Sequence, residues 1–326
     1  MKTSSLFLSL LIAASMLGAP APASSQEAPH VAEATASEHH GGCEEYAPND
    51  FISPHITDAH CLEVPNGWRI WETREVELPR FAPIHIGKLA VDLSPTKHVV
   101  FMLFAAFLCC AVLITAARSH VRHTEAVGRP KGFASAIETI VLYIRNEVAI
   151  PNLGPHGEGY APFILTLFFF ILFANLLGLI PYGSTVTGNI SVTATLAIIT
   201  FFVVEMAGIR ANGIGYLRTI FYWNNDLPVL MRPPMFLLMT PIEFVGKLTK
   251  PFALAIRLFA NMTAGHIVVL ALIGLVFAFK SYALGIAPLA MAVGIMMLEL
   301  FVSFLQAFIF SLLASVFIGQ MREGHH

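Results

Sequence analysis

The sequence predicts an all-α polytopic membrane protein. Its composition, its long apolar runs and the placement of basic residues between those runs carry that prediction. Of the 326 residues, 56% are hydrophobic and only 12% are charged, whereas a soluble domain has about 25% charged residues. The net charge of −2 argues against a general nucleic-acid binder, so no nucleic-acid partner is expected. Most of this chain is therefore expected to lie in a lipid bilayer.

The chain begins with a segment typical of exported proteins, residues 1–23. Lys2 precedes the apolar stretch LFLSLLIAASMLGA, and the small residues of APA at 21–23 offer a cleavage site. The alternative is a short first membrane helix. We favour a cleaved signal peptide because the apolar run is short and small residues follow it.

Residues 24–97 are expected to form an extracytoplasmic N-terminal segment. Its start consists of small and polar residues and is predicted to be disordered. A few short strands are indicated farther on by WRIWETREVELPRF and HIGKLAVDLS. Cys43 and Cys61 form either a disulfide of an exported segment or two free thiols. The histidines of the chain lack the spacing of a defined metal site, so neither a metal nor a cofactor is predicted.

Long apolar runs define a membrane domain over 98–320, with one stretch after another long enough to span a bilayer. The predicted spans lie at about 98–117, 160–181, 190–209, 235–279 and 284–320. The last two are too long for upright helices: residues 288–319 would extend about 48 Å as a helix, against about 30 Å of hydrocarbon. These two spans therefore predict a long, strongly tilted hairpin, with Pro251 and Gly294 as places for a kink.

Loop charges predict the orientation of the spans. Lys and Arg are frequent between the first and second spans and after the third, and they are absent from 182–189. By the positive-inside rule, the N-terminus is outside and the tail 321–326 is cytoplasmic. The expected location is a bacterial cell (inner) membrane. Residues 133–150 alternate apolar and charged residues at helical spacing, which predicts an amphipathic helix on the cytoplasmic face.

Polar residues form one stripe on each of the two long spans. The first stripe has spacings of four and three residues, which places its members on one helix face. It consists of Glu243, Lys247, Lys250, Leu254, Arg257 and Asn261. His266 follows on the opposite side of the same helix. The second stripe stands at i, i+4 and i+7 in the final span. It consists of Glu299, Ser303 and Gln306.

Counting back from the connection near residue 280 brings His266 level with Glu299, and Arg257 level with Gln306. A structural interpretation is open for each residue, since a buried Arg can form a salt bridge and Ser or Gln can join helices. The whole pattern favours function, because a titratable pair inside a membrane is typical of a proton relay. No carboxylate of this chain clearly pairs with Arg257 at its depth, so its partner is expected on another chain.

Three segments carry a resemblance to a known family. They are KPFALAIRLFANMTAGH (250–266), ELFVSFLQAFIFSLL (299–313) and NLLGLIP (175–181). Together they strongly resemble subunit a of the F-type rotary ATP synthase, over about 98–320. The resemblance implies a stator subunit that is not catalytic alone. Its expected partners are a ring of c subunits, the peripheral-stalk b subunits, the soluble ATPase head and membrane lipid.

The resemblance also implies roles for particular residues. Arg257 matches the family's essential arginine, which faces the ring carboxylate and separates two proton half-channels. Asn261, Gln306 and the cytoplasmic-side acid Glu243 match further family positions. His266 and Glu299 are exchanged relative to many bacterial members, as in mitochondrial members, and either arrangement keeps one acid and one imidazole together.

Two other classes of function remain as alternatives. A secondary transporter would use Arg257 as a substrate site, but it usually shows internal repeats, which this sequence lacks. A structural anchor of a membrane complex would not need the pair of His266 and Glu299. The sequence leaves open whether the coupling ion is H⁺ or Na⁺, how large the ring is, and how 24–97 is built.

Overall fold

The computed structural model describes most of the membrane domain and parts of the segment before it. The described residues are 58, 60–66, 69–81, 84–86, 89–91, 94–127, 132–180, 183–216, 232–279 and 282–323. Five helices are long and apolar enough to cross a membrane. This finding confirms the predicted all-α polytopic fold. The expected signal peptide, 1–23, lies outside the described residues.

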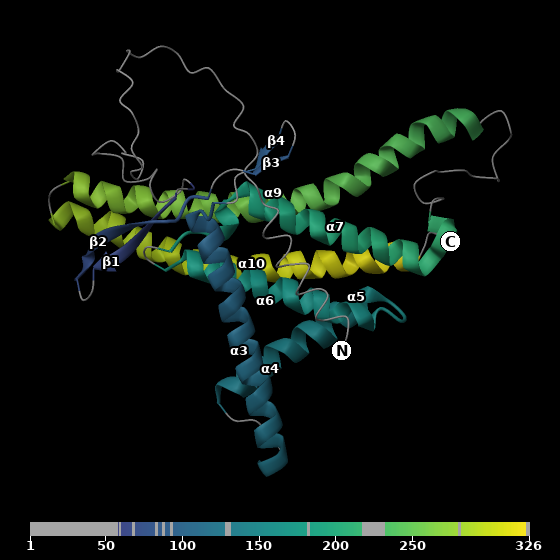
Figure 1. The fold of residues 1–326 in the computed structure, drawn as a ribbon, viewed down its shortest axis with the longest axis horizontal. Helices are drawn as coiled ribbons and strands as arrows, with labels where there is room; N and C mark the ends of the chain where they lie inside the picture. The colour runs from purple at the N-terminus through teal and green to yellow at the C-terminus, as the bar shows by residue number, and fades with distance from the viewer. Residues whose placement is uncertain are drawn as a thin grey trace.

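The five long helices follow the predicted spans closely. They are α3 (Lys97–Val127), α6 (Ala161–Gly178), α7 (Ile190–Asn212), α9 (Arg232–Phe279) and α10 (Tyr282–Glu323). Helices α9 and α10, of 48 and 42 residues, form the predicted antiparallel hairpin, and both cross α3 steeply (Figure 1). Helices of this length exceed a hydrocarbon core of about 30 Å, so they must tilt, kink or extend beyond the hydrocarbon.

Helix α6 is the centre of the bundle. It is apolar around its whole circumference, as expected of a helix surrounded by others, and it packs against α3 and α10. In its most apolar stretch 67% of the residues are buried, against 17% for α9. Helices α9 and α10 therefore keep an uncovered apolar face, with Phe252, Ile256, Met297 and Phe301 among its exposed side chains.

Local signals set both ends of α7. At its start the side chain of Asn189 accepts a hydrogen bond from the backbone N–H of Ser191 (2.9 Å), an N-cap. At its end Gly213 takes a positive φ of 56°, which favours glycine. The turn η4 (Gly213–Tyr216) then folds Tyr216 back against Gly208, where a Cβ atom would collide with the ring.

The helix predicted over 133–150 is present in three consecutive pieces. They are α4 (Phe133–Tyr143), the π-helix η1 (Ile144–Ala149) and α5 (Ile150–Leu153). The wider π-turn, in which Ile150 N–H bonds to the carbonyl of Arg145, precedes Pro151, which has no N–H to donate. Short 3₁₀ turns, η2 (Glu158–Tyr160) and η3 (Val186–Gly188), precede α6 and α7.

The two ends of the bundle are each fastened by side chains. At one end Arg322 of α10 donates hydrogen bonds to the carbonyls of Leu153 (2.8 Å) and Pro155 (2.9 Å); we call this the Arg322 end. At the other end Asp58 bonds to Nδ1 of His98 at the start of α3 (2.7 Å) and accepts from Nδ2 of Asn189 (3.3 Å). We call this the Asp58 end. It ties the N-terminal segment to two helices.

The N-terminal segment contains the short strands that were expected. Strand β1 (Cys61–Asn66) pairs antiparallel with β2 (Arg69–Glu77), and β3 (Ile84–Ile86) pairs antiparallel with β4 (Leu89–Val91). Cys61 is disulfide-bonded. Its expected partner, Cys43, lies outside the described residues.

Candidate functional site

Contacts between polar side chains fix the register of α9 against α10. Nδ2 of Asn261 donates a hydrogen bond to Oε1 of Gln306 (3.2 Å). One turn farther along the hairpin, the hydroxyl of Ser303 faces the sulfur of Met262 (3.9 Å). Gln306 is 3% exposed and Ser303 is fully buried. The polar stripe of α10 therefore packs directly against the turn of α9 that follows Arg257.

Glu299 continues this series of contacts by one more turn. Its carboxylate lies against Gly265, the residue before His266, where a Cβ atom would collide with it. Glu299 is only 6% exposed, and its Oε1 has no hydrogen-bond partner among the described residues. A buried carboxylate oxygen without a partner is costly. The site is therefore suited to a group that binds a proton or a water molecule.

Arg257 lies one helical turn before Asn261 and is exposed. Within the part of the chain that the structure describes, its guanidinium forms no hydrogen bond and no ion pair. Its neighbours on the same open side of α9 include the exposed Phe252 and Ile256. A charge in this position costs about 2.5–3.5 kcal/mol at the centre of a membrane helix, so an anionic partner or water must meet it.

A second polar layer lies behind Ser303. Asn175 of α6 donates to the backbone carbonyl of Ser303 (3.3 Å) and accepts from the hydroxyl of Thr187 (2.7 Å). All three side chains are fully or almost fully buried. The loop between α6 and α7 thus brings polar groups into the bundle, next to the stripe of α10.

Comparison with known proteins decides the family. Residues 99–319, the whole of the helical bundle from α3 to the end of α10, match the ATP synthase A chain family. The chain belongs to this family. Its family, together with the five described helices that are long and apolar enough to cross a membrane, makes it a multi-pass membrane protein of the F-type ATP synthase.

Several bacterial subunits named ATP synthase subunit a are similar to the chain over most of its length. The protein from Chloroherpeton thalassium is 46% identical over 248 residues, which is 75% of this chain and 72% of the relative. The protein from Pelodictyon phaeoclathratiforme is 44% identical over 306 residues, 92% of this chain and 84% of the relative. The protein from Anaeromyxobacter dehalogenans strain 2CP-1 is 41% identical over 295 residues, 87% and 72% respectively.

A separate polar cluster of the chain lies at the Arg322 end. The ammonium of Lys247 donates to the hydroxyl of Tyr216 (3.2 Å), and that hydroxyl donates to Oε2 of Glu205 (2.5 Å). Lys247 is 7% exposed and Tyr216 is 2% exposed. Burial raises the pKa of Tyr216 above its usual range, and the Glu205 carboxylate raises it further. Tyr216 therefore remains a proton donor.

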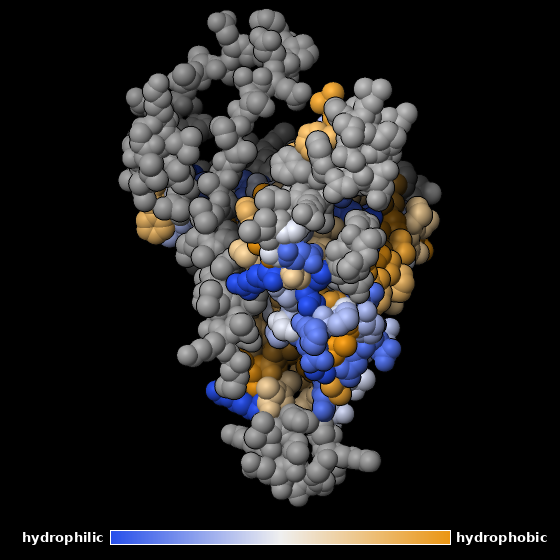
Figure 2. All heavy atoms as spheres, turned by 90° about the vertical axis from the view of Figure 1, so that its right-hand side faces the viewer, coloured by the Kyte–Doolittle hydropathy of each residue, from blue (hydrophilic) through white to orange (hydrophobic). Residues whose placement is uncertain are grey.

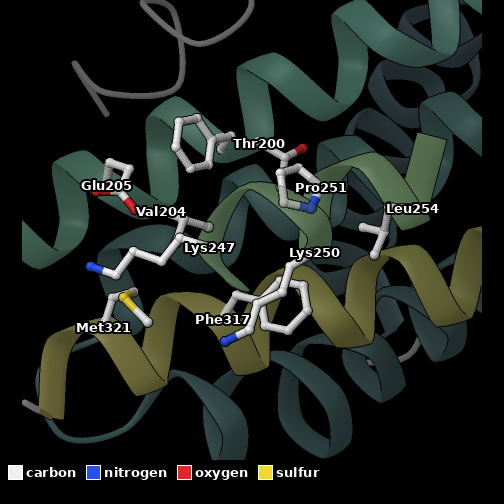
Figure 3. A pocket seen from close by; sticks show the side chains of 10 residues that line it. Thr200, Val204, Glu205, Lys247, Lys250, Pro251, Leu254, Phe317 and Met321 are labelled. Atoms are coloured by element: carbon white, nitrogen blue, oxygen red, sulfur yellow. The ribbon is translucent and has the colours of Figure 1, made fainter. Parts of the chain in front are cut away.

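The cluster opens onto a small pocket between α7, α9 and α10 (Figure 3). Lys247 reaches from α9 toward Glu205 on α7, and Lys250 lies over the ring of Phe317 on α10, 5.1 Å from its centroid. Leu254, one turn before Arg257, also lines the pocket. Seen from outside, hydrophilic side chains gather in the middle of the Arg322 end (Figure 2).

The first polar stripe runs along the edge of the packed side of α9. Lys247 and Leu254 are buried, Glu243 and Lys250 are half-buried, and Arg257 is exposed. The stripe thus turns from the interior toward the open face as it approaches Arg257.

Groups of His, Cys, Asp and Glu that could hold a metal ion are absent from the described residues.

Sequence analysis missed three residues of these polar layers: Asn175, Glu205 and Tyr216. Asn175 is the one amide in the apolar run of 160–181, and Glu205 is the one charged residue in the run of 190–209. Isolated polar residues of this kind are signals that a membrane helix faces other polar groups. Tyr216 carried no such signal, because its place depends on the turn after α7.

Proposed function

We propose that this protein is the stator element that forms two proton half-channels beside the ring of c subunits and couples proton flow to ring rotation. The observation that carries the proposal is the bare guanidinium of Arg257 on an uncovered apolar face of α9. A guanidinium stays charged at every working pH, so it attracts an ionised ring carboxylate and no proton passes through it. A carboxylate that has lost its proton must therefore travel with the ring to reach the other half-channel.

The uncovered face of α9 and α10 supports this partner. It carries large apolar side chains on both sides of Arg257, including Phe252, Met297 and Phe301. A ring of apolar helices with one carboxylate each matches this surface in polarity and charge. The remaining partners, namely the b subunits of the peripheral stalk and the soluble ATPase head, follow from membership of the complex.

The positions of the polar residues support one path on each side of Arg257. On the outer side His266 and Glu299 accept the proton, with Ser303 beside them. Gln306 and Asn261 join the two helices next to Arg257. On the inner side Glu243 serves proton release. The N-terminus is then outside and the C-terminus cytoplasmic, as the loop charges predict.

Substitution of Arg257 tests the proposal in inverted membrane vesicles. In Arg257→Ala, ATP-driven proton pumping should fall more than about 100-fold while the complex still assembles, because nothing separates the half-channels. Arg257→Lys should also fail, since an ammonium lacks the planar fork and can lose its proton when buried. Arg210→Ala is the matched control, because Arg210 is an exposed arginine at the Arg322 end of α7. Normal pumping by Arg257→Ala would refute the proposal.

A further inference from the structure

The pocket at the Arg322 end connects two regions of different polarity. Its lining includes Pro251 and Leu254, from the turn of α9 that leads to Arg257, together with Glu205 and Lys247. Figure 3 shows these side chains converging from α7 and α9. One small pocket thus contains Glu205 and Lys247 and reaches the turn of α9 before Arg257.

A chain of hydrogen bonds orders the charged end of the pocket. Lys247 donates to the Tyr216 hydroxyl, and Tyr216 donates to Glu205. The ammonium of Lys247 also lies 4.5 Å from the centroid of the Tyr216 ring. Glu243 and Lys250 are the other charged groups close enough to act on this cluster. Glu205 is thus held in one orientation, with its carboxylate bonded by a donor that keeps its proton.

A purely structural role does not explain why these residues are charged. Joining α7 to α9 requires only packing, and a buried ion pair is often no more stabilising than apolar residues of the same size. Here Glu205 and Lys247 both belong to the lining of the pocket. The arrangement therefore fits a group that meets water and exchanges protons.

We propose that Glu205 is a proton-exchanging carboxylate of the inner half-channel, with Tyr216 and Lys247 as its positioning residues. This inference rests on the proposed function and adds to it a carboxylate on α7, distinct from Glu243 on α9. A proton released by the ring carboxylate reaches Glu205 through water in the pocket and converts the carboxylate to the acid. The acid then gives the same proton to bulk water at the Arg322 end and returns to the carboxylate. Tyr216 and Lys247 keep their protons throughout.

Passive proton conduction tests this assignment in vesicles from which the soluble head has been removed. Per assembled complex, Glu205→Gln should conduct at least about tenfold more slowly, because the amide cannot take up and release the proton. Lys247→Met should also be slow, and Lys247→Arg should recover much of the rate. Glu147→Gln, which removes an exposed carboxylate outside the pocket, is the matched control and should conduct normally.

A cysteine probe keeps the proposal testable if Glu205→Gln fails to assemble. Thr200 lines the pocket, whereas Ala197, buried on the same helix, does not. In a chain with Cys109 and Cys110 changed to serine, Ag⁺ added to the cytoplasmic side should block conduction by Thr200→Cys and spare Ala197→Cys. Equal insensitivity of the two variants would show that the pocket is not on the path.

The outcomes separate this inference from the proposed function. If Arg257→Ala pumps normally, the stator function itself is wrong. If Arg257→Ala fails but Glu205→Gln conducts at the wild-type rate per assembled complex, the stator function holds and the role of Glu205 is refuted. If Glu205→Gln lowers only the amount of complex, without slowing conduction, the cluster merely joins α7 to α9 and the proposal is overturned.

Discussion

The carboxylate of Glu299 lies against Gly265, in the space that a side chain at position 265 would fill. The absence of a Cβ atom lets α10 bring its acid up to the backbone of α9, one residue before His266. Glycine inside a helix costs about 1 kcal/mol relative to alanine. The close approach of the Glu299 carboxylate explains why a glycine stands at position 265 of the helix.

Alanine at position 265 should impair transport although it favours the helix. Gly265→Ala forces the Glu299 carboxylate to move, and we expect ATP-driven pumping to fall about tenfold, since overpacking costs about 1–3 kcal/mol. The matched control is Gly274→Ala on the same helix, where an added Cβ meets nothing within 4 Å. Pumping in inverted vesicles measures both. Equal activity of the two variants would show that the position of Glu299 does not matter.

His266 and Glu299 should behave as one coupled unit. The Glu299 carboxylate lies against Gly265, the residue before His266, so a proton that enters on one of the two side chains can pass to the other. His266→Glu or Glu299→His alone should slow proton entry by about tenfold or more. The double exchange should recover more activity than either single change, which is the signature of direct coupling. A double variant as inactive as the worse single variant, with the singles conducting normally, would exclude a shared role.

The hydrogen bond between Asn261 and Gln306 should stabilise the hairpin beside Arg257. In Asn261→Ala the buried amide oxygen of Gln306 loses its donor, which costs about 1–3 kcal/mol. We expect a lower melting temperature of the extracted complex and weaker coupling of ATP hydrolysis to pumping. Thr249→Ala serves as the control, because that exposed hydroxyl bonds only within its own helix (3.0 Å to the Gly246 carbonyl). A normal melting temperature for Asn261→Ala would contradict the role.

The attachment at the Asp58 end should depend on pH. Burial raises the pKa of Asp58, but the hydrogen bond and charge of His98 outweigh it and hold the pKa below the usual value of 3.8. A carboxyl whose pKa is lowered on folding stabilises the folded state above its unfolded pKa, about 3.9. That stabilisation, about 1–2 kcal/mol, is lost as the pH falls through the lower, folded pKa.

Proteolysis from the outer side measures this attachment. An acid-active protease should leave β1 and β2 of the wild type intact at pH 5.5 and cut them near pH 3. Asp58→Asn should be cut at both pH values, whereas Glu77→Gln, which alters an exposed carboxylate of β2, should follow the wild type. Identical protection of wild type and Asp58→Asn at pH 5.5 would exclude the role of Asp58.

Hydropathy predicted the membrane spans well because a helix in lipid must be apolar over most of its length. The last two spans, expected at 235–279 and 284–320, are observed as Arg232–Phe279 and Tyr282–Glu323. The first was expected to end at 117 but continues to Val127. Its final turns carry Arg118 and Arg122, so the helix outlasts the apolar run. A hydropathy pattern reports the part in lipid and not the end of the helix.

The candidate site could be predicted where it depends on one hairpin. A short connection and a constant rise per residue fix which turns of α9 and α10 lie level, and Glu299 indeed lies beside Gly265. The cluster of Glu205, Tyr216 and Lys247 could not be predicted in this way. Its members meet only because α7 packs beside α9, and no spacing in the sequence encodes that lateral contact.

The bonds of Asp58 also set an order of events during synthesis. Asp58 and Asn189 are 131 residues apart in the chain, an interval that takes roughly 7–26 s at about 5–20 residues per second. The hydrogen bond between them therefore cannot form until this interval has passed. Only then can the contacts of Asp58 join the start of α3 to the start of α7, so this end of the bundle is completed after the first two spans have been made.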